Sequence, residues 1–310
     1  DASLFINGNL QINGSAAAGV IITPNANIGA TNWGGILFRN TNALSQLRYL
    51  TLDKASRGTH QPYNKAAISA YRANLLIDHL TALNVIDNPI FARYSSVTLT
   101  NSQVHSQVTG DCINVKQGFA VTENCTFAGG TAVDMDAIDY DGITDGVVRN
   151  CIIHDFRGDN NDGLDIGEEC HNLLIENNFI YRCFDKGVSC GQESSATLQH
   201  NTIADCTIGV ALKDLSPVSI NHCTFHGNQI AISGYEKNPG YKGGIGTISN
   251  CILSNSAEQA WYADSTATVN ITYSLSDTEE LIGTGNISAN PLFVDAPHYQ
   301  FAVQPTSPII

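Results

Sequence analysis

The sequence predicts an all-β fold, a single-stranded right-handed parallel β-helix in which the chain winds as a solenoid of stacked coils. Three observations predict it. Short apolar runs recur, and the aliphatic residues at their centres, Ile113, Ile138, Leu164, Val188 and Val210, are separated by 25, 26, 24 and 22 residues. Helix-forming residues are not concentrated in any segment, and a polar corner rich in Asn, Ser and Asp follows each run. Such a period, with several short strands per repeat, is typical of a solenoid.

A second set of apolar runs has the same period, and an asparagine follows most of its members. These asparagines are Asn101, Asn124, Asn150, Asn177, Asn201 and Asn250, and His222 stands in the same row as a corner residue. We expect them to be buried at a corner of each coil, where their side chains bond the backbone of neighbouring coils. Leucine-rich repeats have a similar period, but they require a leucine consensus that is absent here.

We expect one domain over residues 1–310, because no Pro- or Ser-rich linker and no run of charges divides the chain. Residues 1–32 would form the first coil or cap, and residues 33–272 the regular coils, with a longer loop at 235–246 that is suited to binding. Residues 273–310 resemble the closing segment of many bacterial secreted β-helix proteins, which normally runs a few residues further. The chain is therefore expected to be part of a longer polypeptide.

The composition excludes some classes of partner. The net charge is -14, from 29 Asp and Glu against 15 Lys and Arg, so the chain lacks the basic surface that nucleic acid requires. No apolar run is long enough to span a membrane, and no membrane insertion is expected. Few charges with abundant Gly, Asn, Ser and Thr are typical of secreted β-rich proteins, which favours a secreted or cell-surface location.

The nine cysteines follow the repeat and form no Cys-x-x-Cys pair, so a zinc site is not indicated. Cys125 and Cys151 occupy one repeat position, and Cys183 and Cys206 share another. Buried thiols stacked coil over coil are favoured, because Cys is among the most buried residue types. Disulfides between adjacent coils are the alternative.

Acidic residues recur at matching positions of successive coils, most densely in residues 134–166. Because alternate residues of a strand face outward, the residues after each inward-facing aliphatic form an outward row. That row is Asn114, Asp139, Asp165 and Ser189. A second row, two positions further along, is Lys116, Asp141, Gly167 and Gly191. A corner row beside them is Asp111, Asp136, Asp162 and Lys186.

This stacking would bring four carboxylates, of Asp136, Asp139, Asp162 and Asp165, within one coil spacing, where their repulsion is costly unless a cation neutralises it. Flexible carboxylate oxygens suit Ca²⁺ better than Mg²⁺. We therefore predict Ca²⁺ bound by these four residues, with Asp141 as a fifth ligand. The alternative is an acidic face that is merely solvated. Weaker candidate ligands are Asp134, Asp159 and Asn161.

The run Asp136-Ala137-Ile138-Asp139, followed one coil later by Asn161-Asp162-Gly163-Leu164-Asp165, resembles the calcium site of the family 9 pectate lyases. The resemblance covers about three coils. It implies Asp136, Asp162 and Asp165 as calcium ligands, with Asn161 in place of a further acid. It also implies β-elimination, in which the metal binds uronate carboxylates and a lysine on a nearby coil removes the C5 proton.

The position of that lysine is occupied here by Ser189. Lys186, three residues earlier, is the candidate base, and Lys116 is the second choice, because a nearby cation lowers a lysine pKa. The alternative for both is a salt bridge to an acidic neighbour. Arg157 and His154, on the loop before Asp159, are candidates for binding a substrate carboxylate.

Asn161-Asp162-Gly163 also resembles one motif of the polygalacturonases. Glycoside hydrolysis of that type is disfavoured, because the later coils offer only Asp185-Lys186 and Thr207-Ile208-Gly209, without the histidine of that family. The sequence thus predicts a secreted calcium-binding β-helix protein that acts on or binds an acidic, uronate-containing polysaccharide, as a candidate calcium-dependent polysaccharide lyase. The alternative is a non-catalytic structural or glycan-binding module of a larger surface or secreted protein.

Overall fold

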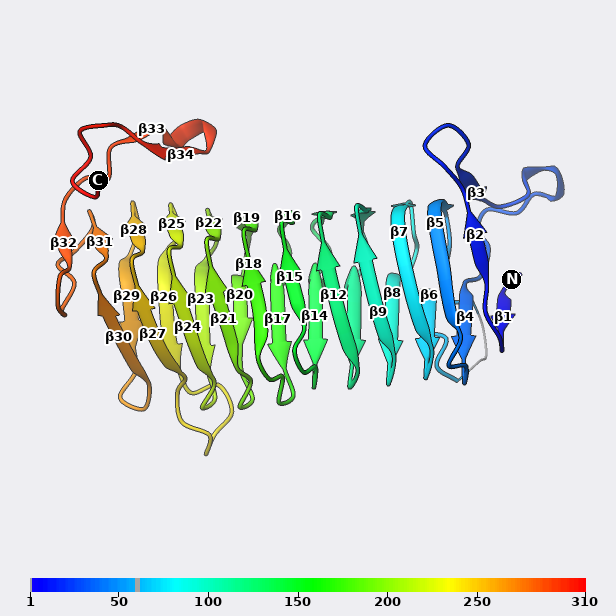
Figure 1. Ribbon diagram of the computed structural model, residues 1–310, viewed down its shortest axis with the longest axis horizontal. Coiled ribbons are helices and arrows are strands. Elements are labelled where there is room, and N and C mark those ends of the chain that lie inside the picture. Colours follow the sequence, from blue (N-terminus) through cyan, green and yellow to red (C-terminus); the bar gives the residue numbers. More distant parts are fainter. Residues whose placement is uncertain (1, 59–61) are drawn as a thin grey trace.

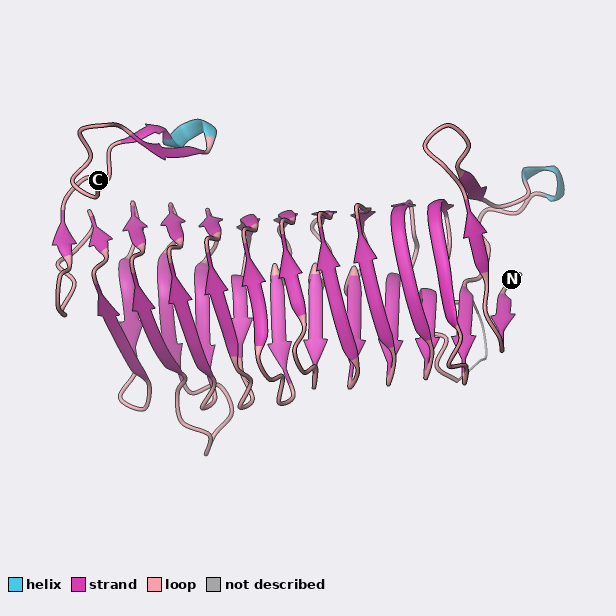
Figure 2. Ribbon diagram, viewed as in Figure 1, coloured by secondary structure: helices cyan, strands magenta, loops and turns pink. Residues whose placement is uncertain are grey.

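The coils of the chain stack along one axis, from the N-terminal end to the C-terminal end (Figure 1). The computed structural model describes residues 2–58 and 62–310. In this part of the chain almost every regular element is a strand, and the helical segments are the 3-10 turns η1 (Ala26–Ile28) and η2 (Ala296–His298) (Figure 2). The all-β fold predicted from the repeat is confirmed.

One face of the stack is a parallel sheet of 11 strands, one from each coil. We call it the first sheet. Its strands are β1 (Leu4–Ile6), β4 (Ile36–Arg39), β6 (Ala66–Tyr71), β8 (Asn88–Arg93), β11 (Ile113–Lys116), β14 (Ile138–Asp141), β17 (Leu164–Gly167), β20 (Lys186–Cys190), β23 (Ile208–Lys213), β26 (Ile230–Tyr235) and β29 (Gln259–Ala263).

The other faces form a second sheet of 21 strands in two parallel series. The first series is β2 (Gln11–Asn13), β5 (Leu44–Asp53), β7 (Asn74–Leu83), β9 (Ser96–Thr100), β12 (Phe119–Glu123), β15 (Val147–Arg149), β18 (Leu173–Glu176), β21 (Ala196–Gln199), β24 (Pro217–Asn221), β27 (Ile245–Ser249) and β30 (Thr268–Thr272). The second is β3 (Val20–Ile22), β10 (Gln103–His105), β13 (Thr126–Ala128), β16 (Ile152–Phe156), β19 (Phe179–Cys183), β22 (Thr202–Ala204), β25 (Thr224–His226), β28 (Ile252–Ser254), β31 (Leu275–Ser276) and β32 (Ile287–Ser288). The long strands β5 and β7 pair with members of both series.

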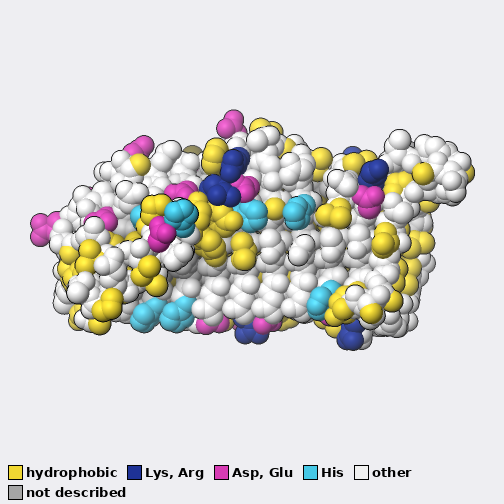
Figure 3. Space-filling model, turned by 90° about the horizontal axis from the view of Figure 1, so that it is seen from above, with side chains coloured by type: hydrophobic (Ala, Val, Ile, Leu, Met, Phe, Trp, Pro, Cys, Tyr) yellow, Lys and Arg dark blue, Asp and Glu magenta, His cyan; other side chains and the backbone are white. Residues whose placement is uncertain are grey.

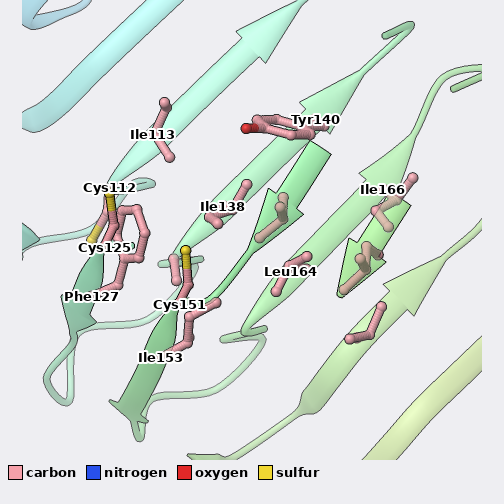
Figure 4. Close-up of a cluster of buried hydrophobic side chains, with 14 of the residues drawn as sticks. Cys112, Ile113, Cys125, Phe127, Ile138, Tyr140, Cys151, Ile153, Leu164 and Ile166 are labelled. Carbon is pink, nitrogen blue, oxygen red and sulfur yellow. The ribbon is translucent and has the colours of Figure 1, made fainter. Parts of the chain in front are cut away.

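The core is a column of apolar side chains inside the coils. Ile113, Ile138 and Leu164 are paired neighbours on successive strands of the first sheet and are 1% exposed (Figure 4). They pack toward residues such as Phe127 and Ile153 of the second sheet. All nine cysteines are buried and free, as the favoured interpretation of their spacing predicts.

The asparagine row differs from the prediction. Asn124, Asn150 and Asn177 are exposed, and each has a positive φ between 53° and 56°. Asparagine tolerates this left-handed conformation better than most residues, which explains its recurrence at the corner. His222 has the same conformation and is stacked on His200, with their ring centroids 5.2 Å apart.

The buried asparagines are one residue further along. Asn178 is 2% exposed and Asn201 is 1% exposed. The Oδ1 of Asn178 accepts from the backbone N of Cys151 (2.9 Å), and its Nδ2 donates to the Val148 carbonyl (3.0 Å). Asn201 thus belongs to this inner row and not to the corner row in which the repeat alignment put it.

The C-terminal segment folds back over the last coils as an antiparallel hairpin of β33 (Phe293–Asp295) and β34 (Gln300–Val303) (Figure 1). The hydroxyl of Tyr299 donates to Asp205 (2.6 Å), and its ring contacts that of Tyr181. Seen from above, hydrophobic side chains gather toward this end of the molecule, next to basic and histidine side chains (Figure 3). Among the described residues no helix is long and apolar enough to cross a membrane.

Candidate functional site

The outward rows of the first sheet come together on β11, β14, β17 and β20. Strand pairing aligns Asn114 with Asp139, Asp139 with Asp165, and Asp165 with Ser189. The adjacent row aligns Lys116 with Asp141. These are the pairs that the repeat alignment predicts, so Asp139 and Asp165 lie on neighbouring coils, whose paired strands are about 4.8 Å apart.

The corner row uses its carboxylates to connect coils. The backbone N of Asp136 donates to Asp111 Oδ1 (3.3 Å), that of Asp162 to Asp136 Oδ1 (2.6 Å), and that of Lys186 to Asp162 Oδ1 (2.9 Å). Each carboxylate therefore has a structural partner whether or not it binds a ligand. This role is not apparent from the sequence, because the sequence does not show which carboxylate oxygen accepts a hydrogen bond from which backbone N–H.

The acidic side chains strongly perturb one another. Burial, followed by repulsion from Asp111, Asp141 and Asp165, raises the pKa of Asp139 to about 9. Burial raises the pKa of Asp162 to about 7, against the opposing effect of Lys186, and holds the pKa of Asp136 well above its ordinary value. At neutral pH part of this cluster therefore carries protons or requires a cation.

The side chains present give mixed support for a metal ion. In residues 2–58 and 62–310, no group of three or more His, Cys, Asp or Glu side chains is arranged to hold one. Asn114 donates to both Asp111 and Asp139, which occupies oxygens that a cation would need. In contrast, the Oδ1 of Asn114 is buried without a hydrogen-bond partner in the described structure, and an amide oxygen is a calcium ligand. The donors suit calcium in type, but their arrangement does not form a cage.

The two lysines predicted as bases lie in environments that keep them protonated. Lys186 is 6% exposed and forms ion pairs with Asp185 and with Asp162, the latter at 3.4 Å. These carboxylates raise its pKa despite its burial. Lys116 forms an ion pair with Asp141, and its pKa is also raised. Both side chains therefore match the salt-bridge alternative and are poor proton acceptors.

A third lysine, Lys213 at the end of β23, has the opposite environment. It is 3% exposed, and burial, the largest cause, lowers its pKa below the ordinary lysine value. Its Nζ donates to Ser189 Oγ (2.5 Å) and lies 3.9 Å from Asp165 Oδ1. Ser189 in turn donates to Asp165 Oδ1 (2.7 Å). The lysine side chain therefore reaches the position next to the acids from a later coil.

The absence of a side chain at Gly191 makes room for this approach. A Cβ at Gly191 would lie 3.1 Å from Cε of Lys213. The sequence contained a signal for Lys213, because it lies three residues after Val210, as Lys116 lies three after Ile113. The predicted outward row that begins at Lys116 ends at Gly191, one coil before Lys213.

Arg157 and His154 are placed differently from the prediction. His154 lies within strand β16 of the second sheet and not on a loop. Its Nδ1 is 2.7 Å from Asp155, which also pairs with Arg157 and Arg182. These three partners hold the pKa of Asp155 well below its usual range. Arg157 and His154 thus belong to an ion-pair cluster with Asp155, and a role in substrate binding is untested.

A family model described as "Right handed beta helix region" matches residues 88–242, half of the chain, and this range contains all the acidic rows and Lys213. No curated protein sequence matches the chain.

Among solved structures, a mutant of the periplasmic alginate epimerase AlgG is similar, with a TM-score of 0.56 and 11% identity over 88% of this chain and 69% of that chain. The catalytic domain of a GH87 alpha-1,3-glucanase has a TM-score of 0.49 and 13% identity over 99% of this chain and 62% of that chain. At these identities the likeness concerns the fold.

Proposed function

The chain belongs to the right-handed β-helix family, and from the acidic rows and the buried lysine of its first sheet we propose that it acts on an acidic, uronate-containing polysaccharide by β-elimination. The observation that carries the proposal is the position of Lys213, which lies 3.9 Å from Asp165 and is 3% exposed. Burial lowers the pKa of this amine below the ordinary lysine value, and a lowered pKa favours a lysine as a general base.

In the proposed step the neutral amine of Lys213 takes the proton from C5 of a uronate residue. The electron pair of the C5–H bond forms a double bond between C4 and C5, and the C4–O bond breaks. The leaving oxygen takes a proton from water. One chain thus becomes two, one of which ends in an unsaturated uronate.

The proton on C5 becomes acidic only when the negative charge of the neighbouring uronate carboxylate is neutralised. Two residues of the site are suited to this. Asp139, with a pKa of about 9, is protonated at neutral pH and can donate a hydrogen bond to the carboxylate. Lys116, with its raised pKa, supplies a positive charge one coil away. Both stabilise negative charge that develops on the substrate.

Calcium binding is a separate part of the proposal. The mutual repulsion of Asp136, Asp139 and Asp165 and the unpartnered Oδ1 of Asn114 support it. A bound calcium ion would neutralise the substrate carboxylate. The carboxylates do not form a cage around a metal ion in this structure. The proposed elimination step therefore uses only the protein's own side chains.

The proposed ligand agrees with one of the similar structures, which is named as an alginate epimerase. A polysaccharide substrate would also place the protein in a secreted, periplasmic or cell-surface location. In such an oxidising location the burial of all nine thiols protects them from oxidants.

The test uses a panel of uronate polysaccharides, with ultraviolet absorbance of the unsaturated product as the readout. We expect absorbance to rise with the native protein and not with Lys213→Met. Inversion at C5 without chain cleavage, detected by proton NMR, would replace elimination by epimerisation at the same base. If neither product forms on any member of the panel, the catalytic proposal fails and a non-catalytic glycan-binding module remains.

A further inference from the structure

The outward row that contains Lys116 and Asp141 continues toward the N-terminal end with a different chemistry. Strand pairing aligns Arg39 with Tyr71, Tyr71 with Arg93, and Arg93 with Lys116. These residues end β4, β6, β8 and β11, four successive strands of the first sheet (Figure 1). A basic and aromatic row therefore leads directly to the acidic one.

Aromatic rings form a platform along this row. The rings of Tyr63 and Tyr71 are stacked with centroids 3.6 Å apart, and Tyr94 meets Tyr71 edge-on at 5.9 Å. Tyr63 is 41% exposed and Tyr94 is 43% exposed. Exposed tyrosine side chains can pack against the apolar faces of sugar rings, because such burial removes apolar surface from water.

The guanidinium groups of the row lack acidic partners. In the described structure Arg39 bonds Asn7, and Arg93 bonds Gln117 and Tyr94, but no carboxylate pairs with Arg39, Arg72 or Arg93. Arg72 lies over the rings of Tyr71 and Tyr94 at 5.3 and 5.8 Å. In a chain of net charge -14, it is unusual to find three neighbouring arginines that have no acidic partner among the described residues. A guanidinium favours a planar anion such as a carboxylate.

We infer that Arg39, Tyr63, Arg72, Arg93 and Tyr94 form subsites for successive uronate residues of an anionic polysaccharide that runs parallel to the helix axis. The inference rests on the proposed function for the identity of the ligand. Coils are spaced about 4.8 Å apart, comparable with the length of one sugar residue, so neighbouring coils can contact neighbouring sugars. The arginines pair with the sugar carboxylates, and the exposed Tyr63 and Tyr94 with the sugar faces, whereas Tyr71 supports Tyr63 from beneath. Substrate is thereby bound on the N-terminal side of Lys213.

The test measures binding in the Lys213→Met background, so that no probe is consumed. Polygalacturonate and alginate are the probes, dextran is the neutral control, and retardation in native affinity gels is the readout. We expect Arg72→Gln/Arg93→Gln to weaken binding of at least one anionic probe about tenfold. The control is Arg48→Gln, which removes one charge as Arg93→Gln alone does, because Arg48 is exposed on the second sheet and likewise has no acidic partner among the described residues. It should bind as the parent does.

The outcomes separate the inference from the proposed function. Equal binding by the double variant and the parent would overturn the subsites, even if the protein with Lys213 intact releases unsaturated product. Equal weakening by Arg48→Gln would also overturn them, because it would indicate a general charge effect. A third result is that the double variant binds the anionic probes more weakly while the protein with Lys213 intact forms no product. That result would support the subsites and contradict the elimination reaction. Melting midpoints of all variants confirm that they are folded.

Discussion

The Nζ of Lys213 lies 2.5 Å from the Oγ of Ser189, although the two residues belong to successive coils. Ser189 occupies the position at which the resemblance to pectate lyases implies a lysine. The amine is thus supplied to this position by β23, one coil further along, across Gly191. An amine can therefore reach a position on one coil from the next coil when the strand at that position lacks a lysine.

The pH dependence of the reaction tests Lys213 as the base. A base acts in its neutral form, so the rate should rise with pH through the pKa of Lys213, which lies below the ordinary lysine value of 10.5. Lys213→Arg keeps the positive charge but cannot lose its proton at these pH values, and we expect about a 100-fold or greater loss of kcat. The measurement is product absorbance against pH.

Lys186→Arg is the control for that experiment, since it preserves ion pairs with Asp185 and Asp162. It should retain activity and the same pH profile. If Lys186→Arg loses activity and Lys213→Arg keeps it, Lys186 and not Lys213 is the base.

The raised pKa of Asp139 predicts that the folded protein loses stability as pH increases. An unfolded aspartate ionises near pH 4, whereas Asp139 in the fold has a pKa of about 9. Between these values the folded state binds more protons, so the free energy of unfolding falls as pH rises from about 4 to about 9. Asp139→Asn should flatten this decline in melting midpoint, measured with chelator present. Parallel pH curves for the two proteins would contradict the assignment.

Calcium should reverse the effect of high pH if it binds among these carboxylates. At about pH 8 we expect added Ca²⁺ to raise the melting midpoint and chelator to remove the increase, because a ligand that binds the folded state stabilises it. Mg²⁺ should do less, since it accepts this flexible oxygen geometry poorly. Asp165→Asn should lose most of the response. An identical midpoint with Ca²⁺ and with chelator would mean that protons alone neutralise the cluster.

Two adjacent asparagines should differ sharply in their contribution to stability. Asn177 is exposed at φ 53°, so Asn177→Ala should cost about 1 kcal/mol of backbone strain, and Asn177→Gly should cost little. Asn178→Ala leaves the buried N–H of Cys151 and carbonyl of Val148 unpaired and should cost about 2 kcal/mol or more. Urea unfolding measures both. A larger loss of stability in Asn177→Ala than in Asn178→Ala would instead indicate that the corner asparagines make the stabilising hydrogen bonds between coils.

The sequence predicts the coils well because the apolar period is a property of each coil by itself. Ile113, Ile138 and Leu164 face inward in register because a slip of one residue would turn each apolar side chain outward. The repeat predicts the positions of the corner asparagines, but it predicts burial where Asn124, Asn150 and Asn177 are exposed. Position in a repeat does not distinguish a residue selected for positive φ from one selected for buried hydrogen bonds.

The candidate site was predictable only in part. The stacking of Asp139 on Asp165 follows from the period alone. The choice among Lys116, Lys186 and Lys213 depends on which carboxylate each amine reaches, and this is a property of side-chain direction between coils. Lys186 and Lys116 reach carboxylates directly, whereas Lys213 reaches Ser189 first. A sequence contains no direct record of that difference.

The loop after β26 should control the environment of Lys213 through Asp214. The carboxylate of Asp214 is fully buried and accepts from the backbone N of Lys237 and Asn238 (2.8 Å each) and from Asn238 Nδ2 (2.6 Å). It therefore holds the loop of residues 236–244 beside Lys213. Asp214 has a φ of 49°, so Asp214→Gly removes these bonds without adding backbone strain.

In Asp214→Gly we expect trypsin to cleave after Lys237 or Lys242 about tenfold faster, because local opening exposes the loop. Water should then reach Lys213, raise its pKa toward the ordinary value and move the activity profile to higher pH. Asn255 also has a positive φ but is exposed, so Asn255→Gly makes the same kind of backbone change away from the loop and should alter neither readout. If cleavage accelerates while the pH profile stays fixed, the loop does not determine the pKa of the base. If both stay fixed, Asp214 does not hold the loop.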